Sequence, residues 1–113
     1  VDPVEELRRW KGRLIPLMHQ KDFSKTARVP VNIWEYTRQD FPITAAFDQT
    51  TRLTELYAEV GDGILPIQDY INAANKLGIE YVLLEQDKTQ IGELASIEAS
   101  MKAFKKFQGT EWE

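Results

Sequence analysis

The sequence predicts an α/β fold in which short parallel strands alternate with helices. Segments 14–18 and 79–84 are apolar along most of their length, which is typical of parallel strands that are buried on both faces. Three segments with the helical spacing of apolar residues lie around them, at about 3–11, 66–77 and 94–106. The resulting order is helix, strand, long loop, helix, strand, helix, and it favours parallel pairing through a right-handed crossover.

Composition limits the protein to a single small domain and excludes several classes of function. The 113 residues suffice for one domain, 1–113, and not for two. A net charge of -4 argues against a nucleic-acid partner or a membrane surface, both of which require a basic face. The absence of cysteine excludes disulfides, thiolate zinc sites and cysteine nucleophiles, and fits a cytoplasmic location. No apolar run approaches the length of a membrane span.

The first predicted helix has recognisable signals at both ends. Asp2 can cap its N-terminus, Pro3 suits the first helical position, and Gly12 provides a stop. Its apolar stripe consists of Val4, Leu7 and Trp10. The strand at 14–18 follows and ends at His19, although Pro16 would remove one donor from its ladder.

Residues 23–58 are predicted to form a long loop with possible extended segments. Apolar residues alternate at 29–33 and again across 52–59. A connection of this length in a compact domain is more often a lid or binding loop than a simple linker. Five aromatic residues are expected to serve in packing: Trp10, Trp34, Tyr57, Tyr70 and Tyr81. Because Trp34 and Phe41 lie in the long loop, they could instead line a sugar pocket.

The second half of the chain repeats the helix and strand pattern. A glycine-punctuated turn at 59–63 precedes a helix with Pro66 near its first turn and Gly78 as its stop. The strand 79–84 ends at Glu85. The last helix is expected to carry Leu94, Ile97, Met101 and Phe104 on one face.

Two apolar parallel strands cannot form a stable sheet alone, because each leaves an outer edge and a face uncovered. Either the middle segment adds strands, or further chain or further copies do. A barrel removes the edges altogether, so we expect this chain to be part of a larger α/β barrel.

His19 and Glu85 are the candidate functional residues, because each follows an apolar strand. In barrel enzymes the chemistry takes place at the C-terminal ends of the strands. An imidazole and a carboxylate there could form half of a mixed nitrogen and oxygen site for Mn²⁺, Zn²⁺, Co²⁺ or Mg²⁺. By residue type alone, a lone histidine is more often structural, and the glutamate could equally form an ion pair or a helix cap.

Three stretches resemble motifs of one family. Residues 13–22, RLIPLMHQKD, resemble the HxKD strand of the sugar phosphate isomerase/epimerase family. Residues 59–63, EVGDG, resemble its ExGxG turn, and 78–87, GIEYVLLEQD, resemble its final strand. The motifs occur in the family's order, and the resemblance covers residues 1 to about 108, with 24–55 poorly matched.

The resemblance implies a C-terminal fragment of a TIM (β/α)8 barrel, with about two βα units and an enlarged βα loop. It implies that His19 and Glu85 bind a divalent metal, that Glu85 also acts as catalytic base, and that Lys21 and Glu59 contact substrate. The other metal ligands of the family, a glutamate and an aspartate, lie on earlier strands that this sequence lacks. Lys21 could instead be a solvated or ion-paired lysine, and Glu59 could simply order the turn.

The expected function is therefore that of a metal-dependent sugar or sugar phosphate isomerase or epimerase, which transfers a proton or hydride next to a carbonyl. The isolated chain, holding half the metal site, is expected to be inactive. One alternative is a non-catalytic fragment that self-associates as a homo-oligomer through its strand edges. A metal-dependent endonuclease on the same barrel fits less well, because the chain has one histidine and is acidic. The sequence leaves open which sugar and which metal are bound.

Overall fold

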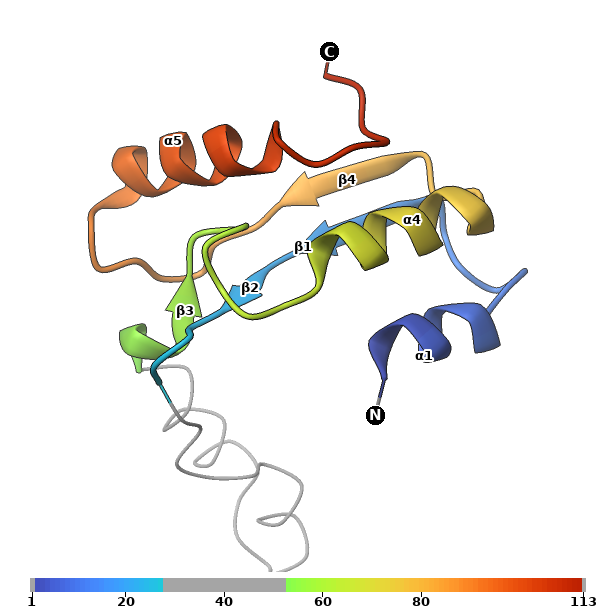
Figure 1. Cartoon of the computed structure of the whole chain (residues 1–113), viewed down its shortest axis with the longest axis horizontal. Coiled ribbons are helices and arrows are strands. Elements are labelled where there is room, and N and C mark those ends of the chain that lie inside the picture. Colours follow the sequence, from blue (N-terminus) through green and yellow to red (C-terminus); the bar gives the residue numbers. More distant parts are fainter. Residues whose placement is uncertain (1, 28–52, 113) are drawn as a thin grey trace, which may run out of the picture.

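The computed structural model describes residues 2–27 and 53–112, which form a small mixed α/β globule (Figure 1). Its three α-helices are α1 (Pro3–Arg9), α4 (Ile67–Leu77) and α5 (Glu93–Phe104). Strands β1 (Leu17–Gln20) and β4 (Tyr81–Leu84) pair in parallel, and β2 (Asp22–Phe23) pairs with β3 (Tyr57–Ala58) in an antiparallel sheet. A short 3-10 helix, Thr54–Leu56, precedes β3.

The parallel pair β1 and β4 confirms the predicted relationship of the two apolar strands. In Figure 1 the two arrows run side by side in the same direction. The first strand begins later than predicted and includes His19, because Pro16 stays outside the ladder as a residue without an N–H. The carbonyl of Pro16 still accepts hydrogen bonds from the backbone N–H groups of Glu80 and Tyr81, at 3.0 Å each.

Helix α4 begins and ends where its sequence signals indicate, and α1 begins at its predicted cap but ends at Arg9, before the predicted stop at Gly12. The Asp2 carboxylate accepts a hydrogen bond from the Val4 N–H at 2.8 Å, which caps α1. Helix α4 starts after Pro66 and ends at Gly78, whose φ of 79° is the left-handed conformation that glycine adopts without cost. The two helices pack against each other. Helix α1 has no fully buried residue, and Trp10 is 48% exposed, so the packing role predicted for Trp10 is wrong.

The expected long loop is closed at its base by the small antiparallel sheet. Asp22 pairs with Ala58 and Phe23 with Tyr57. The extended segment predicted at 52–59 is a strand only at its end, because 54–56 form a 3-10 turn. The alternating segment at 29–33, together with Trp34 and Phe41, lies outside the described residues.

The core gathers between α4, α5 and one face of the parallel sheet. It contains Val60, Ile67, Ile71 and Phe104, and Val82 and Leu84 of β4 pack against it. Helix α5 contributes Phe104 with two small polar residues, Ser96 and Ser100. Of the four apolar residues assigned to one face of this helix, only Phe104 is buried, and the others are exposed: Leu94 at 79%, Ile97 at 53% and Met101 at 38%.

The other face of the parallel sheet is open. Tyr81 and Leu83 alternate with the buried-side residues of β4 and are 56% and 49% exposed, so the packing role predicted for Tyr81 is wrong as well. Within 2–27 and 53–112, each parallel strand pairs on one side only, and the two sheets do not close into a barrel. No helix in this part of the chain is long and apolar enough to cross a membrane.

Candidate functional site

The register of the parallel sheet brings the two predicted metal ligands together. His19 pairs with Leu83, and Glu85 lies two residues after Leu83 on the same side of the strand. The Glu85 N–H donates to the Gln20 carbonyl at 3.0 Å, which continues the ladder one step past β4. The C-terminal ends of parallel strands lie at the same end of a sheet, so the side chains of His19 and Glu85 emerge at the same end of the open face.

Four side chains form a chain of polar contacts at this edge. His19 Nδ1 lies 2.5 Å from Glu85 Oε2, and Lys21 Nζ lies 3.1 Å from Glu85 Oε1. Lys21 also donates to Asp87 Oδ2 at 2.6 Å. An ionised carboxylate only accepts hydrogen bonds, so the contact with Glu85 requires a proton on His19 Nδ1. The result is an alternating series of donors and acceptors that holds each side chain in one orientation.

The charges at this edge stabilise one another. The hydrogen bond from His19, followed by that from Lys21, holds the pKa of Glu85 below its ordinary value of 4.5. The hydrogen bond to Asp87 raises the pKa of Lys21 above 10.5, with partial burial opposing it and Glu85 adding to it. Glu85 is therefore a carboxylate and Lys21 an ammonium at neutral pH. A lowered pKa makes Glu85 a good ligand for a cation and a weak base.

The donor types fit a divalent metal, but the present contact does not leave room for one. An ion bound by both atoms at about 2.0–2.2 Å would need them farther apart than the 2.5 Å between His19 Nδ1 and Glu85 Oε2. The hydrogen bond must therefore open when an ion enters. Within 2–27 and 53–112, no third His, Asp or Glu joins the pair to make a group of three ligands. As a metal site, the pair of His19 and Glu85 alone would be incomplete.

The remaining predicted substrate residue, Glu59, lies in the loop before α4. Its Oε1 accepts a hydrogen bond from the Thr89 hydroxyl at 2.8 Å. The structure thus links Glu59 to the segment that follows Glu85. Contact with a substrate by Glu59 or Lys21 stays a prediction.

Two aspartates at this edge were not singled out from the sequence. Asp87 is the partner of Lys21, and Asp22 is buried beneath the turn at 61–65. Both close motifs that the sequence does display, HQKD at 19–22 and EQD at 85–87. The two motifs therefore display both aspartates in the sequence, but only the folded chain shows what each carboxylate contacts.

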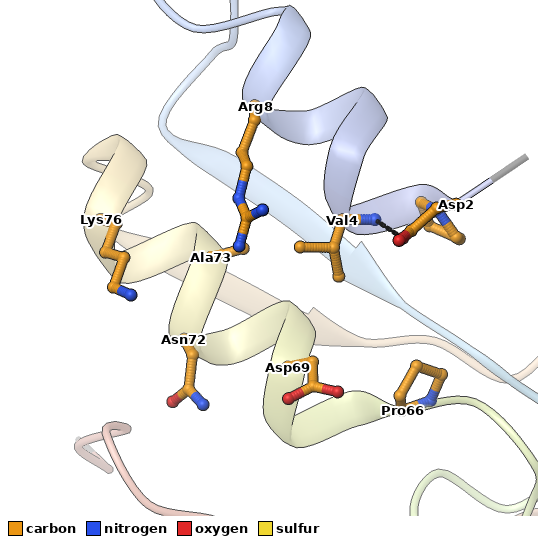
Figure 2. A pocket seen from close by; sticks show the side chains of 9 residues that line it. Asp2, Val4, Arg8, Pro66, Asp69, Asn72, Ala73 and Lys76 are labelled. Atoms are coloured by element: carbon orange, nitrogen blue, oxygen red, sulfur yellow. Dashed lines mark hydrogen bonds between the residues drawn. The ribbon is translucent and has the colours of Figure 1, made fainter.

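A second concavity lies between α1 and α4, away from the candidate site. Figure 2 shows Arg8 of α1 pointing toward α4, which presents Asp69, Asn72 and Lys76 to the same groove. Its volume is about 530 Å³. The carboxylates of Asp2 and Asp69 balance the two cations on its walls, so its charge favours neither anions nor cations.

Nothing matches this chain in comparisons with protein-family models, with curated proteins or with solved structures. The family resemblance of residues 13–22, 59–63 and 78–87 therefore stays a prediction from the sequence.

Proposed function

We propose that this chain is the part of a metal-dependent sugar isomerase or epimerase that carries two of its metal ligands, His19 and Glu85. One observation carries the proposal: an imidazole and a carboxylate from two adjacent parallel strands meet at the C-terminal end of an uncovered sheet face. That is the position at which barrel enzymes hold their reacting groups.

The surfaces around the sheet support a larger barrel. A groove of about 540 Å³ lies between α1 and β1 and is walled by Trp10, Leu14 and Met18. A larger one, about 960 Å³, runs along β4 and includes Ile97 and Met101 of α5. Neighbouring βα units would fill these grooves beside both strands, since parallel sheets are normally covered on both faces. In the proposed barrel, the open face of Tyr81 and Leu83 is the interior.

Chemically, isomerisation moves a proton or hydride between carbons next to a carbonyl. His19 and Glu85 would hold a divalent ion, and the chemistry that such an ion supplies is stabilisation of the developing negative charge. Glu85 suits this role because its pKa is lowered and its carboxylate is ionised. A base role for Glu85 is the weaker part of the proposal, since the same lowering reduces its affinity for a proton. Lys21, held by Glu85 and Asp87, is positioned to donate to a substrate oxygen.

Metal binding is the step that can be tested on the chain itself. In an NMR titration with Mn²⁺, we expect broadening centred on the His19 ring and on residues 84–86. When fructose is then added, the bound Mn²⁺ should increase the relaxation rates of the sugar carbons next to the carbonyl more than that of the distal carbon. His19→Ala and Glu85→Ala should each abolish the localised broadening, because two ligands alone bind weakly and one binds less.

Glu80→Ala is the matched control, because Glu80 is an exposed carboxylate beside the opposite end of β4. It should leave the broadening unchanged. Broadening that is absent at millimolar Mn²⁺, or that persists in both alanine variants, would overturn the proposed site.

The second candidate function is a non-catalytic fragment that associates with copies of itself. The exposed apolar residues Leu83 and Ile97, together with an unpaired edge on each parallel strand of the described chain, favour it. The edge of β1 in one copy is complementary to the edge of β4 in another, because both strands run in parallel. This candidate makes the oligomeric state, and not metal binding, the decisive measurement.

A further inference from the structure

The Asp22 side chain is enclosed by the loop that precedes α4. It is 5% exposed. Its carboxylate accepts hydrogen bonds from four backbone N–H groups at 2.8–3.1 Å, those of Phe23, Gly61, Gly63 and Leu65. These donors replace the water that a buried carboxylate loses, and bonds to an ionised acceptor are stronger than neutral ones.

The glycines of the loop allow this close approach. A Cβ on Gly63 would lie 2.1 Å from Asp22 Oδ1 and 2.4 Å from the Phe23 carbonyl oxygen, so no side chain fits there. Gly61 has a φ of 93°, a conformation that costs other residues. The Ile64 N–H also donates to the Phe23 carbonyl at 2.9 Å. The turn is thus folded closely around Asp22.

The same loop contacts the end of the other strand. Glu59 accepts from Thr89, which lies four residues after Glu85. Asp22 directly follows Lys21 and lies three residues after His19. Residues 59–65 therefore bridge the two strand ends that carry His19, Lys21 and Glu85.

We propose that Asp22 is a positioning residue: by holding residues 61–65, it keeps His19 and Lys21 directed at Glu85. Alternation along the chain explains how it can do so without touching the site. Lys21 points to the open face, and Asp22 points into the loop on the other side. We call residues 59–65 a brace between the two strand ends. The hydrogen bonds to Asp22 are its first tie, and the Glu59–Thr89 hydrogen bond is its second tie. The inference rests on the proposed function where it concerns metal binding, and on geometry alone where it concerns the His19–Glu85 contact.

Asp22→Asn tests the proposal with almost no change in size. The amide oxygen can still accept from two N–H groups, while its NH₂ group would face the N–H groups of Gly61 and Gly63. We expect the ¹⁵N shift of His19 Nδ1, at fixed pH, to move toward that of a free imidazole. The chain has one histidine, so the signal is unambiguous. The Kd for Mn²⁺ should rise roughly tenfold, as is typical when a ligand loses its support.

Thr89→Val removes the second tie and should shift both readouts in the same direction by a smaller amount. Ile71→Val is the control for general destabilisation, because Ile71 is a core residue of α4 at 1% exposure and its side chain takes no part in the hydrogen bonds of Asp22 or Glu59. It should lower the melting temperature and leave both readouts unchanged. If Asp22→Asn does not fold, Thr89→Val decides the question.

Two results would overturn the proposal: a folded Asp22→Asn protein with an unchanged His19 signal, or an Ile71→Val protein with the same changes. Failure of the proposed metal-binding function gives a different experimental result. If the wild-type chain binds no Mn²⁺, the metal site is wrong, while the His19 signal still tests the brace.

Discussion

At the scale of single residues, the candidate site is an alternation of hydrogen-bond donors and acceptors where the two parallel strands end. His19, Glu85, Lys21 and Asp87, in that order, each contact the next member of the series at 2.5–3.1 Å. The sequence predicted the first three as site residues from their places after apolar strands and in the family motifs. It could not predict that Lys21 is shared by two carboxylates, because that depends on the pairing of two strands that are far apart in the chain.

The lowered pKa of Glu85 predicts a dependence of stability on acid. Because the folded-state pKa lies below 4.5, ionised Glu85 stabilises the fold above that pH, and the contribution is lost as the pH falls through the lowered value. Glu85→Gln should therefore be less stable than wild type at neutral pH, with the difference shrinking as the pH falls below 4.5. Thermal melts across this range measure it. Glu80→Gln, beside the other end of β4, is the control, and a Glu85→Gln deficit that is constant with pH would contradict the prediction.

At the scale of elements, helix ends were predicted better than helix faces. The ends of α4 follow from Pro66 and Gly78, which act through local backbone geometry. The buried face of α5 does not follow from its own sequence. Its apolar stripe of Leu94, Ile97 and Met101 is exposed, and the helix instead turns small Ser96 and Ser100 toward the core. Small side chains let the backbone approach closely: the Ser100 hydroxyl accepts from the buried Val60 N–H at 3.1 Å.

The stop of α4 gives an element-scale prediction. Gly78 has a φ of 79°, and no atom lies within 4 Å of the position of an added Cβ. Gly78→Ala should therefore destabilise the chain by about 1 kcal/mol through backbone strain alone. Gly78→Asn should cost less, because asparagine tolerates this conformation. Urea unfolding of both variants measures the difference, and an alanine variant as stable as wild type would show that this cap contributes nothing.

At the scale of the whole molecule, the parallel sheet of the described chain is covered on one face and open on the other. One face of the parallel sheet packs on α4 and α5, while the face of Tyr81 and Leu83 has no cover within 2–27 and 53–112. Exposed apolar surface beside unpaired strand edges favours association with further strands. Both proposed functions use this surface, one for the rest of a barrel and one for further copies.

Association through the open face can be measured directly. Leu83→Lys places a charge on that face beside His19, its partner in the register. It should shift sedimentation toward monomer at concentrations where the wild-type chain associates, because burying an unpaired charge is costly. Ile64→Lys is the matched control, since Ile64 is 57% exposed in the loop before α4 and is not part of the parallel sheet. Equal effects of both substitutions would assign association to general solubility and not to the open face.

The sequence by itself determined the alternation of helices and strands, the parallel relation of β1 and β4, the ends of α4 and the meeting of His19 with Glu85. These follow from local periodicity, from caps and from the rule that parallel strands end at one edge. Only the tertiary structure decided that Asp22 is enclosed by the loop at 61–65, that Asp87 holds Lys21, and that α5 leaves its apolar stripe exposed. Each of these depends on which distant surfaces meet, and that depends on packing between elements, which local patterns do not encode.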